Sequence, residues 1–316
     1  NGEAQVWMFR LNRDQNRLDL LYGDPATGAV TTVLQEEEDT YIDVEDSKIQ
    51  YLDDGAHFVW MTENPGYKHL HLYRNDGTFI GPTTQGDWEV TAFHGIDEGT
   101  GTAYFTATKA SSTERHLYRT AVNFEPHEEA APAERISEAP GTHGVNMSRD
   151  MRYYIDTHST ITQPPVVTLH RAGGEQLAVL EDNEALIERL ARLDLPAPEF
   201  TQVPGADGTP LNAYVIRPDD FDPGRTYPLL MYVYGGPGAQ TVINAWGGAR
   251  QLWHQYLARE LGVVVASVDN RGTGGRGKAF QDVPYKRLGV PEARDQIAAA
   301  RHFAAEPYID STRIGI

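Results

Sequence analysis

Cysteine is absent from the 316-residue sequence, which excludes disulfides, thiolate metal sites and cysteine nucleophiles. Lysine is scarce, because only five of the 27 basic residues are lysine. The formal net charge is −18, and such a surface is a poor partner for nucleic acid, since phosphate contacts need clusters of lysine and arginine. This acidic composition fits a high-salt habitat, and it fits equally a GC-rich genome that favours arginine.

Long apolar runs are also missing. No stretch approaches 18 consecutive apolar residues, so the sequence predicts no membrane span. No basic segment followed by an apolar one opens the chain, so no signal peptide is visible, and Asn1 resembles the start of a fragment. A chain of 316 residues is too long for one ordinary core, which favours two domains.

The first half of the chain contains four similar units. Each has an apolar, aromatic-rich strand, a polar turn and a second strand that ends in Leu-Tyr or its equivalent, with anchors at Tyr22, Tyr73, Tyr118 and His170. Repeats of roughly 40–50 residues built from several short strands are typical of propeller blades. We therefore predict that residues 1–180 are the C-terminal blades of a partial β-propeller, with earlier blades outside this chain.

A short amphipathic helix is predicted next, within a connecting segment at residues 181–198. Asp182 or Asn183 can cap its start, and Pro196 lies beyond its end. Its leucines share one face at i, i+4 and i+7, and they are Leu186, Leu190 and Leu193.

Residues 199–316 alternate between strands and helices. A hairpin is predicted around Asp207, buried strands at 228–236, 262–270 and 313–316, and helices at 249–261 and 291–306. Antiparallel strands followed by β/α units favour the N-terminal part of an α/β-hydrolase domain.

Two stretches carry a family resemblance, YPLLMYVYGGPGAQ at 227–240 and VDNRGTGGRGKAF at 268–280, followed by RLGVPEARDQIAAARHF at 287–303. Together they resemble the prolyl oligopeptidase family of serine peptidases, and most of all its dipeptidyl peptidase IV-like branch. The segments NPGYKHLHLY, GDWEV and VLEDN in the first half resemble the last propeller blades of that branch.

The resemblance implies a serine exopeptidase that releases N-terminal dipeptides and prefers proline or alanine at the second position. Its substrates would be peptides with a free N-terminus, and it would need no cofactor and no metal. The resemblance also implies a possible homodimer and a periplasmic or secreted location.

Tyr234 is the candidate site residue. A buried strand is predicted to end at Val233, and the carboxyl ends of such strands are where open α/β sheets place their sites. Gly235, Gly236 and Pro237 then force a sharp turn. The resemblance implies that the Tyr234 hydroxyl is an oxyanion-hole donor, whereas the alternative is a core tyrosine bonded to the backbone.

The glycine-rich segment DNRGTGGRG resembles a phosphate cradle, but it lacks the GK(S/T) ending of a P-loop. We interpret it as a loop at the end of a strand, in which Asp269 and Arg271 fix the loop and do no chemistry.

The catalytic triad is not visible. No Gly-x-Ser-x-Gly elbow occurs, and the resemblance places the serine beyond Ile316, with the aspartate and histidine later still. It also places the two glutamates that bind the substrate amine N-terminal to Asn1. We therefore interpret the acidic run Glu36–Glu38 as a solvated segment between strands.

The histidines show no H-E-x-x-H zinc motif. His69, His71 and His127 are predicted to lie at the surface, and His254 and His302 on helices, as packing or surface residues.

Two alternatives stay open. An acylaminoacyl or oligopeptide hydrolase of the same superfamily would accept blocked N-termini. A non-catalytic propeller–hydrolase binding protein would lack the triad, although it would have no chemical need for a phenol at position 234.

Overall fold

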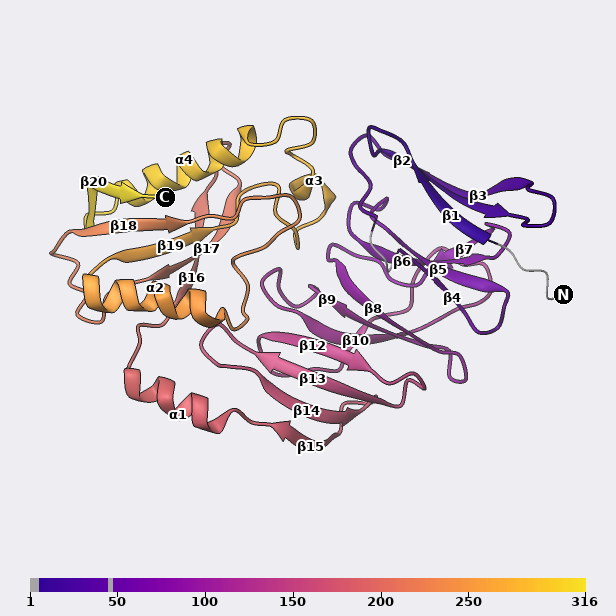
Figure 1. Ribbon diagram of the computed structural model, residues 1–316, viewed down its shortest axis with the longest axis horizontal. Helices are drawn as coiled ribbons and strands as arrows, with labels where there is room; N and C mark the ends of the chain where they lie inside the picture. Colours follow the sequence, from indigo (N-terminus) through magenta and orange to yellow (C-terminus); the bar gives the residue numbers. More distant parts are fainter. Residues whose placement is uncertain (1–5, 45–47) are drawn as a thin grey trace.

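The first part of the chain is a succession of antiparallel sheets (Figure 1). The computed structural model describes residues 6–44 and 48–316, and the first five residues of the predicted propeller segment lie outside that range. The first sheet contains β1 (Val6–Leu11), β2 (Arg17–Gly23) and β3 (Val30–Glu37). The second contains β4 (Ile49–Tyr51), β5 (His57–Thr62), β6 (His69–Arg74) and β7 (Phe79–Pro82). The third contains β8 (Val90–Asp97), β9 (Thr102–Ala107), β10 (His116–Ala121) and β11 (Glu134–Arg135). The fourth contains β12 (Thr142–Met147), β13 (Tyr153–Ser159), β14 (Val166–Arg171) and β15 (Gln176–Glu181).

The predicted anchors lie on equivalent strands of these sheets, β2, β6, β10 and β14. In three of them the anchor ring stacks on an aromatic ring of the preceding strand. The ring centroids are 5.4 Å apart for Phe58 and Tyr73, and 5.9 Å apart for Phe105 and Tyr118. Cross-strand pairs of this kind stabilise and register a sheet. The propeller prediction is therefore confirmed as an array of blade-like sheets, and the described sheets do not close into a ring.

The prediction of surface positions for His69 and His71 was wrong. His69 is 1% exposed, and its two ring nitrogens lie 2.9 Å from Thr84 Oγ1 and 2.8 Å from the Gly86 carbonyl. His71 is half-buried. On strand β6, Leu70 and Leu72 fill the core on one face. On the other face, Thr84, Gly86 and Trp88 cover the ring of His69. Alternation of polar and apolar residues does not mean exposure where sheets pack on both faces.

Helix α1 (Glu184–Leu193) lies within the predicted connecting segment. Asp182 accepts a hydrogen bond from the Glu184 backbone N–H at 3.0 Å, whereas the Asn183 side chain makes no cap bond. None of its residues is buried, and Leu193 is 50% exposed. In the described part of the chain, no helix combines the length and apolarity needed to cross a bilayer.

The fifth sheet forms the second part of the molecule, with the order β16-β17-β19-β18-β20. Its strands are β16 (Glu199–Pro204), β17 (Pro210–Ile216), β18 (Tyr227–Tyr232), β19 (Val264–Val268) and β20 (Ile309–Gly315). The hairpin β16–β17 and the pair β17–β19 are antiparallel, whereas β18 runs parallel to both β19 and β20. This is the predicted start of a hydrolase domain. The last strand is longer than predicted, because it begins at Ile309.

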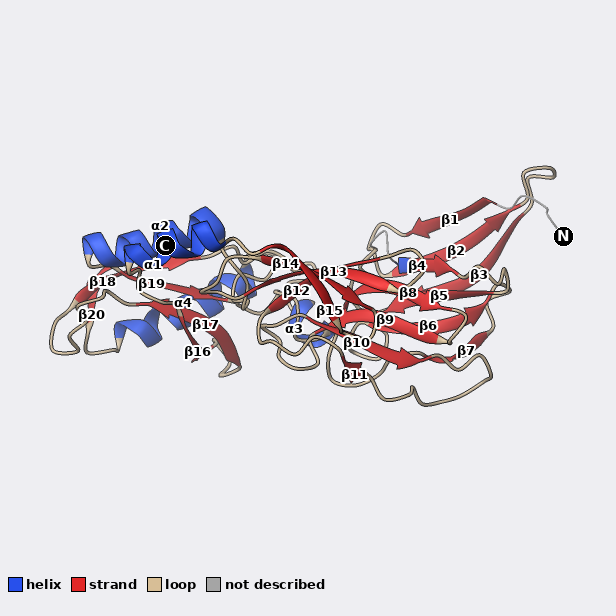
Figure 2. Cartoon of the chain, turned by 90° about the horizontal axis from the view of Figure 1, so that it is seen from below, coloured by secondary structure: helices blue, strands red, loops and turns tan. Residues whose placement is uncertain are grey.

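Helices cover both faces of this sheet (Figures 1 and 2). Helix α2 (Gly248–Leu261) packs Leu257 and Ala258 into the core on one face. Helix α4 (Val290–Ala304) packs Ala299 and Phe303 into the core on the other face. The single-turn helix α3 (Lys278–Gln281) was not predicted. The loops that follow β18 and β19 reach the propeller sheets, so the carboxyl ends of these strands meet the domain interface.

Candidate functional site at the domain interface

Tyr234 lies just beyond the carboxyl end of β18. The side chain is 65% exposed, and no group of the described residues bonds its hydroxyl, so it is not a core tyrosine. Gly235 and Gly238 have φ of 71° and 69°, values that glycine adopts without strain and that force the chain to turn here. Strand β20 lies directly beside β18, with Leu230 opposite Gly315. A group carried just past β20 would therefore lie close to Tyr234.

Asp269 fixes the segment that follows this turn. Its carboxylate accepts hydrogen bonds from the backbone N–H of Thr241 at 2.9 Å and of Val242 at 3.0 Å, and from the Thr241 hydroxyl at 2.7 Å. Burial raises the pKa of this carboxyl group, although these hydrogen bonds oppose the shift. Its predicted role as a loop-fixing residue is confirmed.

Arg271 also fixes a loop, as predicted. Its guanidinium binds the fully buried Asp295 of α4, with nitrogen–oxygen distances of 2.9 and 2.8 Å, and it also pairs with Asp207 in the β16–β17 turn. Hydrogen bonding to Asp295 raises the pKa of the guanidinium further. One side chain thus ties the start of the glycine-rich loop to a helix and to a hairpin.

The glycine-rich loop holds an anion, but that anion is a side chain of the propeller. The backbone N–H of Gly275 donates to Glu89 Oε2 at 3.0 Å, and the N–H of Gly277 donates to Glu89 Oε1. Glu89 precedes β8 and is only 8% exposed. The loop therefore takes a carboxylate from the other domain where a P-loop would take a phosphate.

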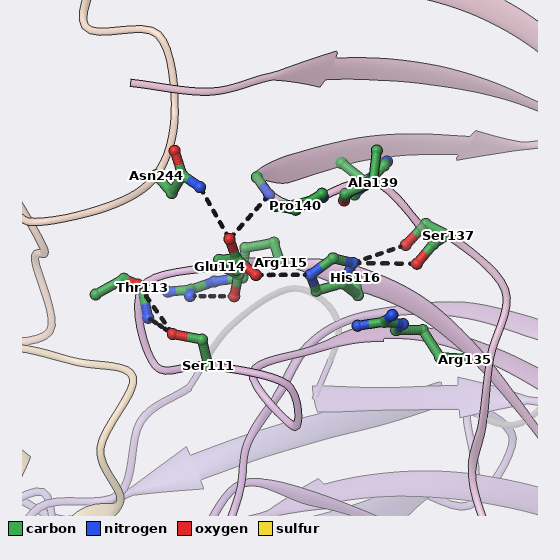
Figure 3. A network of polar contacts seen from close by, with 12 residues as sticks. Ser111, Thr113, Glu114, Arg115, His116, Arg135, Ser137, Ala139, Pro140 and Asn244 are labelled. Carbon is green, nitrogen blue, oxygen red and sulfur yellow. Dashed lines mark hydrogen bonds and ion pairs between the residues drawn. The ribbon is translucent and has the colours of Figure 1, made fainter. Parts of the chain in front are cut away.

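A second contact crosses the interface at Glu114 (Figure 3). Its Oε1 accepts hydrogen bonds from Asn244 Nδ2 at 2.8 Å and from the Gly141 N–H at 3.0 Å, and its Oε2 lies 3.0 Å from His116 Nε2. Burial alone would raise the pKa of Glu114, but the bonds to His116 and Asn244 outweigh burial and lower it. Asn244 lies between β18 and α2, so the propeller holds this loop as well.

A small cavity lies between the two domains, beside Glu89. Its volume is about 180 Å³, and its lining includes Glu89, Arg115, Gly238 and Gln240. The Arg115 guanidinium binds the Gln240 side chain, which in turn donates to the Ser112 carbonyl at 2.8 Å. The turn after Tyr234 is thus held by propeller groups on one side and by the glycine-rich loop on the other.

Sequence reasoning missed the roles of Glu89, Glu114 and Asn244. The partners in these contacts are between 130 and 188 residues apart in the chain. No local sequence pattern predicts contacts between residues so far apart in the chain. The segment GDWEV had been noticed only for its resemblance to a family, and that was the one available signal.

The interpretation of Glu36–Glu38 as a solvated run was wrong for Glu36. This residue is 5% exposed and accepts hydrogen bonds from Trp60 Nε1 at 2.9 Å and from Thr62 Oγ1 at 2.7 Å. Lys48 Nζ lies 2.9 Å from its carboxylate. A buried carboxylate needs such donors and a counter-charge, and Glu36 has both. Its role is structural, and Glu37 is the exposed member of the run.

The other three histidines considered in the sequence pack against neighbouring groups. His127 is half-buried, so it lies at the surface as predicted, and its Nε2 is 3.1 Å from the Pro82 carbonyl. His254 is 4% exposed on α2 and lies beside the ring of Tyr232. His302, on α4, is half-buried. Among residues 6–44 and 48–316, no group of three or more histidine, aspartate or glutamate side chains could hold a metal ion.

Two family profiles match the chain. The profile described as the dipeptidyl peptidase IV N-terminal region matches residues 1–165, and that of the prolyl oligopeptidase family matches residues 249–316.

Individual relatives agree. A probable dipeptidyl peptidase 4 from Emericella nidulans is 35% identical over 83% of this chain and 33% of its own length. A dipeptidyl peptidase 4 from Trichophyton equinum is 33% identical over 82% of this chain, again 33% of its own length. The chain thus spans about a third of the length of these curated relatives.

Solved structures agree as well. The crystal structure of Porphyromonas gingivalis dipeptidyl peptidase 4 superposes with a TM-score of 0.91 at 35% identity, covering 99% of this chain and 43% of the other. A putative dipeptidyl aminopeptidase IV from Bacteroides ovatus gives a TM-score of 0.83 at 27% identity, covering 98% of this chain and 46% of the other. With its sheets, its Tyr-Gly-Gly-Pro turn and both profiles in agreement, the chain belongs to the prolyl oligopeptidase family of serine peptidases, in its dipeptidyl peptidase IV branch.

Proposed function

We propose that the full-length protein is a serine exopeptidase that removes dipeptides from free peptide N-termini, with a preference for proline or alanine at the second position. Tyr234 is the residue of this chain that takes part in the chemistry. A Ser–Asp–His triad beyond Ile316 supplies the nucleophile, and glutamates N-terminal to Asn1 bind the substrate amine. The preference and the triad are inferred from the family and from the named relatives.

One observation carries the proposal. The Tyr234 side chain stands exposed at the carboxyl end of β18, on a turn that other groups of both domains hold in place. The neighbouring strand β20 runs parallel to β18, so a nucleophile just past β20 would place the reacting carbonyl beside the phenol. A hydroxyl held there donates a hydrogen bond to the negatively charged oxygen of the tetrahedral intermediate.

The other residues of this chain position the loops around the site and enclose it. Asp269 and Arg271 fix the two loops at the carboxyl edge of the sheet. The propeller sheets cover that edge, which limits access to small or unfolded peptides and reduces water near the reacting bond.

Hydrolysis of Ala-Pro and Gly-Pro chromogenic amides by the full-length protein tests the proposal, with the N-acetylated amides as controls. Cleavage of only the free-amine substrates is the expected result. Cleavage of both would favour the acylaminoacyl or oligopeptide hydrolase. No cleavage of either by folded protein would favour the non-catalytic binding protein. A periplasmic or secreted location and a homodimer stay predictions, which fractionation and light scattering can check.

A further inference from the structure

We infer that Glu89 is a positioning residue that acts across the domain interface, because its carboxylate holds the glycine-rich loop against the turn that carries Tyr234. The inference rests on the proposed function, in which Tyr234 is the oxyanion donor. It assigns to the propeller a part in catalysis that is separate from controlling access.

Glu89 is itself rigidly held. Its backbone N–H donates to Thr108 Oγ1 at 2.9 Å, and the Thr108 N–H donates back to the Glu89 carbonyl at 2.9 Å. These bonds fix it to the third sheet, where β8 begins one residue later and β9 ends one residue before Thr108. The carboxylate therefore projects from backbone that the β8–β9 pair holds in place, and a positioning residue requires such a rigid backbone.

The loop is shaped to receive this carboxylate. Gly275 and Gly277 have φ of 85° and 82°, and each directs its N–H at one oxygen of Glu89. A Cβ at Gly277 would lie 2.8 Å from the ring of Tyr67, and one at Gly275 would lie 2.9 Å from Gln240 Oε1. Only glycine allows the loop to approach this closely, and an ionised acceptor makes both hydrogen bonds strong.

The loop in turn supports the turn after Tyr234. The Gly238 N–H donates to the Gly272 carbonyl at 2.9 Å, and a Cβ at Gly274 would lie 2.7 Å from the Gly238 carbonyl oxygen. The two backbones are thus in direct contact. A shift of the glycine-rich loop would move Gly238, and with it the short turn that begins at Tyr234.

Other contacts keep the domains together without Glu89. Lys278 Nζ donates to the Tyr41 carbonyl at 2.7 Å and lies 3.7 Å from the Glu63 carboxylate, while Glu114 binds Asn244. Removing the charge of Glu89 should therefore loosen the loop and leave the two domains assembled. Misplacement of a catalytic group by about 1 Å can cost roughly 10²-fold in rate.

The test uses Glu89→Gln in the full-length protein. Glutamine keeps the shape of the Glu89 side chain and one of its two acceptor oxygens. Its NH₂ group replaces the other oxygen and would face the N–H of Gly275 or Gly277, which it cannot accept. Glu98→Gln is the matched control, because Glu98 begins the β8–β9 turn, at the opposite end of β8 from Glu89, and accepts the Asp53 N–H at 2.6 Å. We expect E89Q to lower kcat about 10- to 100-fold with KM within about threefold, and E98Q to match the wild type.

A double-mutant cycle separates positioning from a general structural role. If Glu89 acts through Tyr234, E89Q should lower kcat less than about twofold further in a Tyr234→Phe background. The inference would be overturned if E89Q lowered kcat by the same factor in the Tyr234→Phe background as in the wild type. It would also be overturned if E89Q were as active as the wild type.

Hydrogen exchange provides a measurement that does not depend on activity. In E89Q, exchange should accelerate in peptides covering 271–281 and 233–240, and E98Q should change neither. Unchanged exchange at 233–240 in E89Q would refute the coupling even if no substrate were cleaved. An inactive wild type with the expected exchange pattern would instead refute the proposed function alone.

Discussion

Glu36 and Lys48 form a buried ion pair in the propeller, with Oε2 and Nζ 2.9 Å apart and each side chain only 4% exposed. Lys48→Met should lower the free energy of unfolding by about 3–5 kcal/mol, because it leaves a buried carboxylate without its counter-charge. Urea unfolding followed by fluorescence measures this change. The exposed pair Arg192–Glu188 on α1 gives the control, since Arg192→Ala should cost less than about 1 kcal/mol. Equal costs for the two variants would contradict the prediction.

The propeller should lose stability in mild acid. Burial lowers the pKa of both His71 and His94 to about 4, so both are neutral in the folded protein at pH 6. His69 lowers the pKa of His71 further, while Glu36 opposes that shift. The unfolded chain binds more protons between pH 6.5 and 4, so this stability is present in full above pH 6.5 and is lost as the pH falls towards 4.

Urea midpoints at pH 7.5, 6.0 and 4.5 measure this loss, which should be on the order of 1–3 kcal/mol for each histidine. His71→Gln and His94→Gln do not titrate, so each should show a shallower fall in stability with decreasing pH than the wild type. Curves parallel to that of the wild type would show that these rings do not carry the pH dependence.

Tyr234→Phe should lower kcat about 10²- to 10³-fold and leave KM nearly unchanged, because the hydroxyl acts on the charge that develops in the transition state. Its melting temperature should equal that of the wild type, since the side chain is 65% exposed. Tyr256→Phe is the control, because Tyr256 is 46% exposed on α2 and away from the turn. If Tyr234→Phe kept full kcat, Tyr234 would not be the oxyanion donor.

Gly274→Ala should impair both catalysis and stability. A Cβ there would lie 2.7 Å from the Gly238 carbonyl oxygen, so the two backbones must separate. We expect kcat to fall at least about tenfold and the free energy of unfolding to fall by about 1–3 kcal/mol. Gly173→Ala is a matched control, because neither glycine has a positive φ and a Cβ at Gly173 has nothing within 4 Å. Similar kinetics for the two variants would contradict the prediction.

Local patterns predicted much of the fold. The anchors at Tyr73 and Tyr118 lie on equivalent strands because their spacing reflects one repeated structural unit. Helix α4 begins at Val290, one residue before its predicted start at Pro291. The Tyr234 turn was also visible, since consecutive glycines and a proline after a buried strand leave few other conformations.

Long-range packing could not be predicted in the same way. His69 alternates with leucines as surface residues often do, but the segment between β7 and β8 folds over its ring, through Thr84, Gly86 and Trp88. Glu36 belongs to an acidic run, and only the approach of Trp60 and Lys48 makes that position an interior one. The donors that Glu89 binds come from a loop almost 190 residues further along the chain.

That separation has a consequence for folding. Contacts between residues so far apart carry a large loop-closure entropy and form after local ones. Because Thr108 holds Glu89 where β8 meets β9, we expect this pair of strands to form before the glycine-rich loop docks on the carboxylate. During synthesis we therefore expect the earlier domain to fold first and to provide the surface on which the later one completes its site.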